Sequence, residues 1–390
     1  MLIHSIKLGN FLSYGAPDLQ QAVELGPLNI IIGANGSGKS NLLEAIELLR
    51  SAPDQFIRPI SEGGGVRDWL WKGAEKTPTA SIEVVIDNPK GNQNIRYCLE
   101  FTEISQRFQL VDERIENEKP VNGDKAQAYF FYHFNNGRPT LNINKKKRLL
   151  QIEQIDLNAS ILSQRRDPEQ YPEVTYLAQV LGNIRLYREW SFGRYTMPRV
   201  PQKADLANDF LDSEARNLAL ILNDLQGNPL VKKRVLTALK NLYDGIDDYF
   251  VRIDGGTVQV YFQEGKFTVP ATRLSDGTLR YLSLLAILCH PKPPRLVCIE
   301  EPELGLHPDV IPTLAELLKE ASQRCQIIVT THSDTLIDAM SDRPDAVLVS
   351  EKGEGGTKLT RLNPQQLKPW LEKYRLGQLW TRGEIGGTRW

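Results

Sequence analysis

The chain has 390 residues, which suggests two or three domains or one large domain with an insertion. Hydrophobic residues make up 41% and charged residues 24%, and this usage argues against a disordered, collagen-like or coiled-coil chain. Lys and Arg number 47 against 48 Asp and Glu, so the net charge of -1 excludes a chain-wide basic field, and any DNA contact must come from a local patch.

Apolar runs are too short to cross a bilayer, and the first residues alternate like a strand instead of forming the apolar segment of a signal peptide. We therefore expect a cytoplasmic protein with no membrane contact. The cysteines form no CxxC pair, and we expect buried free thiols at all of them. They are Cys98, Cys289, Cys298 and Cys325.

The first 50 residues predict a strand, a turn, a second strand, a Gly-rich loop and a helix. The apolar run Leu28–Ile32 is typical of a buried strand. The helix is expected over Ser40–Arg50, because four apolar residues repeat there at helical spacing. They are Leu42, Leu43, Ile46 and Leu49.

The rest of the chain changes texture three times. From Thr79 to about Asp156 it alternates like antiparallel strands, and from residue 172 to 245 it is mainly helical. From Arg273 to about Val349 apolar strands and helices return, so the simplest account is an α/β core split by a long insertion. The expected units are 1–165, the first half of the core with an antiparallel lobe; 166–270, a helical insertion ending in a hairpin; 271–350, the second half of the core; and 351–390, a tail.

The segment GANGSGKS fits the phosphate-loop pattern and lies between an apolar strand and a helix, as that pattern requires. Its glycines let the backbone wrap phosphates, Lys39 can reach the β and γ phosphates of ATP, and the Ser40 hydroxyl can bind Mg²⁺. The candidate nucleotide-binding residues are Gly33, Ala34, Asn35, Gly36, Ser37, Gly38, Lys39, Ser40 and Asn41.

Two consecutive carboxylates, Glu300 and Glu301, end the apolar run Leu296–Ile299. Neighbouring side chains on a strand point to opposite faces, so the two cannot do the same job. One is expected to join the Mg²⁺ shell and the other to face the γ-phosphate and its attacking water.

Two further segments are weak signals when taken alone. Ser275 and Gly277 in LSDGT stand at a helix start, which offers a hydroxyl, amides and a positive dipole end to an anion, although an ordinary helix cap has the same pattern. His332 follows a buried strand, where a histidine is more often structural.

The order of these four segments resembles that of ABC-type ATPases in the branch that includes the SMC proteins, RecF and the ATPase half of OLD-family nucleases. The resemblance covers residues 1–50 and 273–340, and Ile6–Tyr14 is similar to the N-terminal signature of that branch. It implies an α/β fold: a P-loop ABC-type core of a mixed sheet flanked by helices, with an antiparallel β lobe and a short helical insertion.

The resemblance also implies a role for each residue. LSDGT, with Ser275 and Gly277, matches the signature motif, Glu300 the magnesium-associated carboxylate, Glu301 the catalytic base and His332 the switch histidine. The branch more often has Asp at the position of Glu300. A glutamine usually senses the nucleotide and metal, and Gln164 lies at the expected junction, with Gln151 and Gln154 as competitors.

The function implied is an ATP-dependent, Mg²⁺-dependent switch that forms a homodimer around two nucleotides and controls DNA repair or anti-phage defence. No DxD pair of a nuclease centre follows His332, so a nuclease effector would be a separate protein, and direct DNA contact stays open. The alternative is the cytoplasmic energy-coupling subunit of a transporter, which the long interval between Ser40 and Ser275 disfavours. A kinase or GTPase is disfavoured because no NKxD motif occurs.

The last residues, Leu376–Trp390, combine two Trp, several Gly and two Arg. Exposed Trp and Arg would suit an interface with protein or nucleic acid. A tail packed onto its own domain by the Trp rings is an equally good interpretation.

Overall fold

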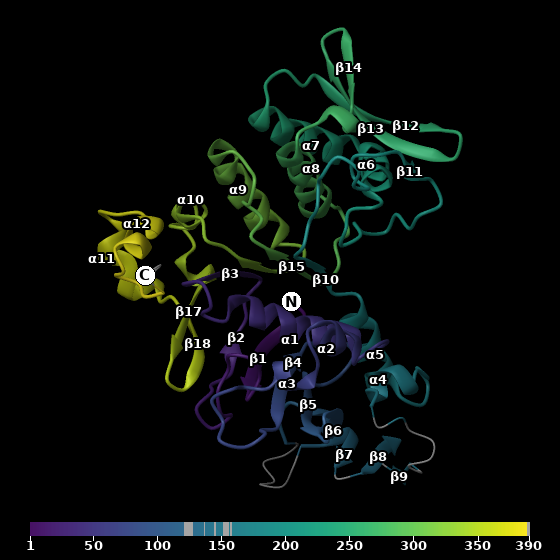
Figure 1. Cartoon of the computed structure of the whole chain (residues 1–390), viewed down its shortest axis with the longest axis vertical. Helices are drawn as coiled ribbons and strands as arrows, with labels where there is room; N and C mark the ends of the chain where they lie inside the picture. The colour runs from purple at the N-terminus through teal and green to yellow at the C-terminus, as the bar shows by residue number, and fades with distance from the viewer. Residues whose placement is uncertain (121–127, 136, 144–145, 151–155, 157, 388–390) are drawn as a thin grey trace.

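The structure is a computed structural model that describes residues 1–120, 128–135, 137–143, 146–150, 156 and 158–387. Three β-sheets follow one another along the longest axis of the molecule (Figure 1). The central sheet carries the phosphate loop, an antiparallel sheet lies at one end, and a small sheet lies at the other.

The central sheet is parallel except at one edge, where β17 and β18 form a hairpin. Because the carboxyl ends of parallel strands meet at one edge of a sheet, the residues that follow β10, β15, β16 and β3 are brought together. The strand order is β10 (Arg185–Tyr187), β15 (Leu296–Glu300), β16 (Gln326–Thr330), β3 (Leu28–Ile32), β17 (Val347–Gly353) and β18 (Gly356–Arg361).

The second sheet is antiparallel and contains β1, the first strand of the chain. β1 pairs with β4, and the phosphate loop lies between these two strands in the sequence. This sheet is the antiparallel lobe that the alternating pattern after Thr79 predicts. Its order is β2 (Val23–Glu24), β1 (Ile3–Gly9), β4 (Ala80–Ile86), β5 (Ile95–Ile104), β6 (Arg107–Asn117), β7 (Phe130–Asn135), β8 (Arg138–Ile143) and β9 (Lys146–Leu149).

The small third sheet consists of β11 (Gln202–Lys203), β13 (Thr257–Glu264), β12 (Asp248–Asp254) and β14 (Phe267–Pro270). The helices are α1 (Lys39–Ser51), α2 (Arg58–Glu62), α3 (Val66–Trp69), α4 (Ile161–Gln164), α5 (Pro172–Gly182), α6 (Leu218–Gln226), α7 (Pro229–Leu242), α8 (Asp276–Leu288), α9 (Ile311–Ala321), α10 (Asp334–Asp338), α11 (Pro364–Leu371) and α12 (Leu376–Thr381).

Two hydrophobic cores cover the two faces of the central sheet. Along β3, Ile31 packs into one core with α1, α5 and the antiparallel sheet, whereas Ile30 and Ile32 pack into the other with α6, α8, α9 and the small sheet. This alternation follows from the two-residue period of a strand. With apolar partners on both faces, β3 is buried along its whole length and gives the phosphate loop a fixed origin.

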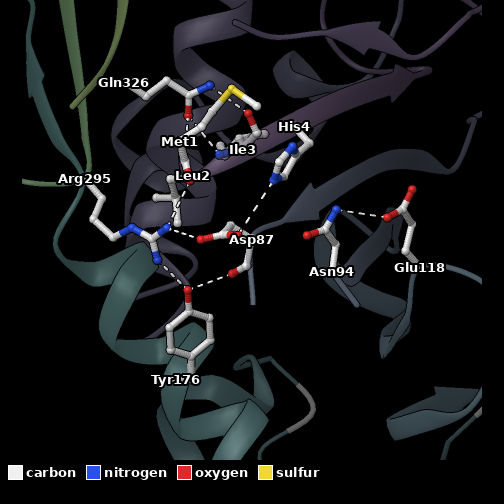
Figure 2. Close-up of polar contacts among 10 residues, drawn as sticks. All are labelled: Met1, Leu2, Ile3, His4, Asp87, Asn94, Glu118, Tyr176, Arg295 and Gln326. Carbon is white, nitrogen blue, oxygen red and sulfur yellow. Dashed lines mark hydrogen bonds and ion pairs between the residues drawn. The ribbon is translucent and has the colours of Figure 1, made fainter. Parts of the chain in front are cut away.

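Polar contacts fix the first strand against the central sheet (Figure 2). The Gln326 side chain accepts from the amide of Ile3 at 2.8 Å and donates to its carbonyl at 2.7 Å. Arg295, just before β15, pairs with Asp87 after β4 and donates to the Tyr176 hydroxyl of α5 at 2.5 Å. These contacts join residues far apart in sequence, so the antiparallel lobe and the core form one continuous structure.

The structure differs from the sequence expectation in the range 166–270. β10 lies inside this range, yet it is an edge strand of the central sheet, and β11–β14 form a sheet beside the helices. Only three residues form β10, too few for periodicity to reveal a strand. The domain boundaries themselves stay predictions.

The four cysteines are buried and free, as expected. Among the helices of the described ranges, none combines the length and the apolar character that crossing a membrane requires.

Candidate active site at the carboxyl edge of the central sheet

The phosphate loop runs from the end of β3 to the start of α1 and requires glycine at two places. Gly33 has φ +151°, and a β-carbon there would lie 2.3 Å from the Ser350 carbonyl oxygen. Gly38 has φ +102°, and a β-carbon there would lie 2.3 Å from Thr357 Oγ1. Both contacts come from the β17–β18 hairpin, so larger side chains would push the loop away from the strand beside it.

The Lys39 side chain is folded back over its own loop. Its ammonium donates to the carbonyls of Gly33 at 2.8 Å and Ala34 at 3.0 Å, and only 6% of the residue is exposed. Burial lowers the pKa of Lys39, and the nearby carboxylates of Glu301 and Glu300 oppose that shift. The ammonium is therefore positioned by the loop and lies within the electrostatic reach of both carboxylates.

Of the remaining loop residues, those near the two ends of the loop are hydrogen-bonded to neighbouring segments, and those at its tip are exposed. The Ser37 carbonyl accepts from Ser350 Oγ at 2.9 Å and from Thr357 Oγ1 at 2.8 Å, and Asn41 Nδ2 donates to Ser13 Oγ at 2.7 Å. Asn35 and Gly36 at the tip are exposed. The loop thus keeps its shape through contacts on its outer side and leaves its tip accessible.

Ser40 and Glu300 face each other, as the sequence predicts for a shared metal. The Ser40 hydroxyl donates to Glu300 Oε1, and the second carboxylate oxygen accepts from Arg188 Nε at 2.9 Å. Arg188 also pairs with Glu44, one turn along α1, at 2.8 Å. A guanidinium between two carboxylates fixes the Glu300 side chain against the start of α1.

Glu301 faces a different partner from Glu300, but the reason is not the alternation of a strand. β15 ends at Glu300, and Glu301 has a left-handed backbone with φ +44°. Its amide donates to the Thr330 carbonyl at 2.9 Å, and its carboxylate lies 3.4 Å from His332 Nε2. The strained turn therefore aims the second carboxylate toward the end of β16.

Two residues without a predicted role position this pair. Glu303 Oε1 accepts from the amide of His332 at 2.9 Å and from the Thr331 hydroxyl at 2.6 Å. Burial raises the pKa of Glu303, and these bonds oppose the shift. From α8, the buried Arg280 donates to the Glu301 carbonyl at 2.8 Å. The turn after β15 is thus held from both neighbouring elements.

The predicted signature segment lies at the start of α8. Ser275 is exposed, and its hydroxyl caps the helix by accepting from the amide of Thr278 at 3.1 Å. A β-carbon on Gly277 would lie 2.7 Å from the Gly305 carbonyl oxygen, so glycine allows the loop after β15 to approach. Arg199 donates to the Leu274 carbonyl and to the Asp276 carboxylate from the other side.

Gln164 lies away from the other predicted residues. Its side chain donates to the carbonyls of Asp156 and Ala159 at 3.0 and 2.9 Å, within its own turn. Two residues later, Arg166 donates to the Pro53 carbonyl beyond the last turn of α1, whereas Ser40 lies in the first. Because a 13-residue helix is about 20 Å long, this position argues against Gln164 as a metal ligand.

The two competing glutamines, Gln151 and Gln154, lie outside the described residues. Among the described residues, Arg188 at the end of β10 has the place beside Glu300 that a sensor of the nucleotide and metal would need. The sequence signal for it is faint: a single basic residue after a three-residue apolar-polar strand.

Family comparisons agree with this geometry. Residues 5–248, more than half of the chain, match a family described as "AAA domain". The chain belongs to this AAA domain family. Residues 191–338 of the AAA domain protein also match a family described as "AAA domain, putative AbiEii toxin, Type IV TA system". A comparison with curated proteins finds no match.

Solved structures of SMC heads share the fold of this AAA domain protein. An SMC head bound to the C-winged helix domain of ScpA has a TM-score of 0.55 at 16% identity, over 93% of this chain and 99% of that chain. An SMC head with an extended coiled coil bound to the C-terminal domain of ScpA, derived from Pyrococcus furiosus, has 0.56 at 15%, over 95% and 98%. An SMC head with a coiled coil and joint from Pyrococcus yayanosii has 0.52 at 11%, over 95% and 99%.

These comparisons confirm the predicted fold class, which the chain shares with SMC heads. At such low identity the SMC heads show the fold alone. The roles of the individual site residues stay predictions.

Proposed function

We propose that this AAA domain protein hydrolyses ATP with Mg²⁺ and works as a switch that closes as a homodimer around two nucleotides. The observation that supports this most is the meeting of Lys39, Ser40, Glu300 and Glu301 at one edge of the central sheet, while Ser275 is presented elsewhere on the surface. The first group consists of the residues that one chain contributes to ATP binding and hydrolysis. The second has no described contact with the phosphate loop.

The residues at this edge fit a magnesium ion. Ser40 and Glu300 are oxygen donors that already face each other, and Mg²⁺ prefers such ligands together with water and phosphate oxygens. Both would hold the ion, which when bound neutralises charge developing on the phosphates. Arg188 and Glu44 keep Glu300 pointed at Ser40.

Hydrolysis assigns separate tasks to the other side chains. The Lys39 ammonium exchanges its loop carbonyls for β and γ phosphate oxygens of ATP. Glu301 takes a proton from the water as the water oxygen bonds to the γ-phosphorus and the bond from that phosphorus to the bridging oxygen breaks. His332, at 3.4 Å, orients the Glu301 carboxylate.

A pocket of about 520 Å³ extends from the phosphate loop along Ser13 and Asn41 toward Trp71 and Lys72. It offers an aromatic ring and polar groups, which suit a nucleobase and ribose. A larger cavity of about 740 Å³ lies between β1–β2 and the β17–β18 hairpin, and two of its lining residues, Tyr14 and Thr357, hydrogen-bond to the Gly38 and Ser37 carbonyls of the loop. The smaller pocket, which Asn41 lines, is the better candidate for the nucleobase site.

The anchoring of the signature segment supports the proposed closure around two nucleotides. Gly277 and Arg280 tie α8 to the loop after β15, so the exposed Ser275 is anchored to the segment that carries Glu301. A second copy could place its own Ser275 on the γ-phosphate. Binding by the partner would then reach Glu301 through α8.

We further propose that the switch controls a separately encoded effector, a nuclease first among them, in DNA repair or anti-phage defence. Support comes from the resemblance to RecF and OLD-family ATPases and from the second matched family, whose description names a toxin and a Type IV TA system. The SMC heads above are bound to domains of ScpA, a partner protein. Identification of proteins and nucleic acids that co-purify with the full chain in ATP, but not in ADP, tests this step.

The direct test of the proposed function is release of phosphate from ATP by the purified chain, with Mg²⁺ and with a chelator. Turnover that needs Mg²⁺ and disappears in Lys39→Ala supports the proposal. Turnover that survives in Lys39→Ala comes from a contaminant or another site and contradicts it.

A further inference from the structure

The C-terminal segment Leu376–Gly387 is packed onto the core and is not a free tail. Leu376, Leu379 and Trp380 of α12 are buried, and Trp380 is only 2% exposed. Leu376 and Trp380 join the same hydrophobic core as β3 and α9. Of the two interpretations of this composition, the packed tail is the one that the described residues show.

One end of this segment lies against the phosphate loop. Gly387 is buried with φ +60°, and a β-carbon there would lie 3.3 Å from the α-carbon of Gly33 and 2.8 Å from Val349 Cγ1. Its amide donates to Glu351 Oε1 at 3.0 Å, and its carbonyl accepts from Trp380 Nε1 at 2.8 Å. The backbone at Gly387 is therefore held on both sides, and a side-chain carbon added there would press on the first glycine of the loop.

The other end of the segment lies against α10, which begins two residues after His332. The amide of Gly377 donates to Asp338 Oδ1 at 2.8 Å, and a β-carbon on Gly377 would lie 2.3 Å from the Asp334 carbonyl oxygen. The amide of Leu376 donates to Ser341 Oγ at 2.9 Å. As Figure 1 shows, α12 stands beside α10 at the same side of the core.

We propose that the segment Leu376–Gly387 is a positioning element of the nucleotide site, which holds the phosphate loop in its binding shape through Gly387. This inference rests on the proposed function, because it concerns the loop that would bind ATP. Gly387 acts through Gly33 and touches no phosphate itself. The segment also connects the loop to the helix that follows His332.

The physical reason is that Gly33 has no room to retreat. A β-carbon on Gly33 itself would meet the Ser350 carbonyl oxygen at 2.3 Å and Ser37 Oγ at 2.8 Å, so Gly33 is packed closely against β17 as well as near Gly387. An added methyl group at Gly387 must therefore move Gly33, Val349 or the segment itself. A displacement of a few tenths of an ångström at Gly33 would shift the amides that face the phosphates.

Gly387→Ala tests this, with Gly265→Ala as the matched control. Gly265 has φ +55°, close to that of Gly387, but a β-carbon there would meet nothing within 4 Å. Both variants carry the same backbone cost of a left-handed alanine, and only Gly387→Ala presses on the loop. We expect Gly387→Ala to raise the Kd for ATP and the KM about tenfold with kcat within about twofold, and Gly265→Ala to match the wild type.

Trp380→Phe is the second variant, because it removes the Nε1–H donor to Gly387 and keeps a smaller aromatic ring in the core. We expect a smaller rise in the Kd for ATP, about threefold, and a lower melting temperature because the smaller ring leaves a cavity in the core. ATP affinity equal to wild type in a folded Gly387→Ala protein overturns the inference. If Gly387→Ala does not fold, an unchanged Kd in Trp380→Phe overturns it. Failure of the wild type itself to bind ATP would instead overturn the proposed function.

Discussion

The phosphate loop and the signature segment differ in how far the chain satisfies their own polar groups. Around the loop, Lys39, Ser40 and Glu300 all bond to groups of the same chain, and the hairpin, Ser13 and Gly387 brace the loop from outside. At the signature, Ser275 is exposed, and the bonds described for its hydroxyl stay within the first turn of α8, to the amide and the hydroxyl of Thr278.

This difference indicates which step one chain can perform alone. A loop whose shape is already held can bind ATP without the cost of ordering it, so nucleotide binding should need one chain. An exposed signature tied to the loop after β15 is suited to act on a nucleotide in another copy. Hydrolysis should therefore need two chains, and variants of the two regions should fail in different ways.

Glu301→Gln should produce the largest effect and isolates the chemical step. The amide keeps the shape of the side chain but cannot take a proton, so hydrolysis should fall by about 10² to 10⁴ while ATP and Mg²⁺ still bind. Single-turnover phosphate release together with an ATP titration measures both. Loss of ATP binding in this variant would contradict the assignment.

Glu300→Gln is the matched control for that variant. It weakens the charge opposite Ser40, so its defect should shrink as the Mg²⁺ concentration is raised, which no base variant should show. ATP turnover against Mg²⁺ for both variants separates the two carboxylates. A defect in Glu301→Gln that Mg²⁺ rescues, with none in Glu300→Gln, would show that the roles are exchanged.

Lys39→Ala tests the role of the phosphate loop in ATP binding. Removing a buried ammonium from its phosphate partners should weaken ATP binding by roughly 30- to 1000-fold. Lys233→Ala, at an exposed position of α7, is the control and should bind like wild type. Calorimetric titration of ATP into both variants, after each is shown to be folded, checks this. Equal ATP affinities of Lys39→Ala and wild type would contradict the assignment of the nucleotide site.

Ser275→Arg tests the role of the signature segment without changing the phosphate loop. Binding of ATP to one chain should change by less than about twofold, whereas hydrolysis should fall at least about tenfold because a bulky charge enters the surface that meets the second copy. Thr237→Arg, on the exposed face of α7, adds the same charge away from that surface and should hydrolyse normally. Wild-type turnover in Ser275→Arg would show that the signature assignment is wrong.

The phosphate loop could be predicted from the sequence because its residues are contiguous and lie between a strand and a helix with clear periodicity. The signature and the two carboxylates followed from their order along the chain. The reason given for the separation of Glu300 and Glu301 was wrong, because the strand ends at Glu300 and a left-handed residue, not the pleat, turns Glu301 aside.

The rest of the site depends on contacts between segments that are distant in sequence. Arg188 reaches Glu300 only because β10 joins the central sheet inside a range that looked helical. Gly387 reaches Gly33 only because α12 packs against α10. No local pattern encodes such pairings, so Arg188 carries only a faint sequence signal and Gly387 carries none.

An effect on stability, and not on nucleotide binding, should come from a residue far from either region. Glu113 in the antiparallel sheet is fully buried, and burial raises its pKa from 4.5 to about 7, although bonds from Ser160, Ile161 and Tyr97 oppose the shift. The folded state then binds a proton that the unfolded state has lost, so this group costs stability as pH rises from about 4.5 through 7. The loss is on the order of 3 kcal/mol in the free energy of unfolding.

Thermal melts from pH 5 to 8 measure this. Wild type and the site variants should lose stability in parallel as pH rises, and Glu113→Gln should have a shallower slope, because its amide does not titrate. The amide would also face the amide of Ile161, which adds a constant cost but no slope. Equal slopes in wild type and Glu113→Gln would refute the shift.

The measurement that tests the account most directly is the mass in solution of Glu301→Gln, with and without Ser275→Arg, in ATP and in ADP. If the phosphate loop is complete in one chain and the signature acts across copies, Glu301→Gln should become a dimer in ATP and Mg²⁺ and remain a monomer in ADP. The double variant should bind ATP and stay monomeric. A Glu301→Gln protein that binds ATP without dimerising, or a double variant that still dimerises, would contradict the account.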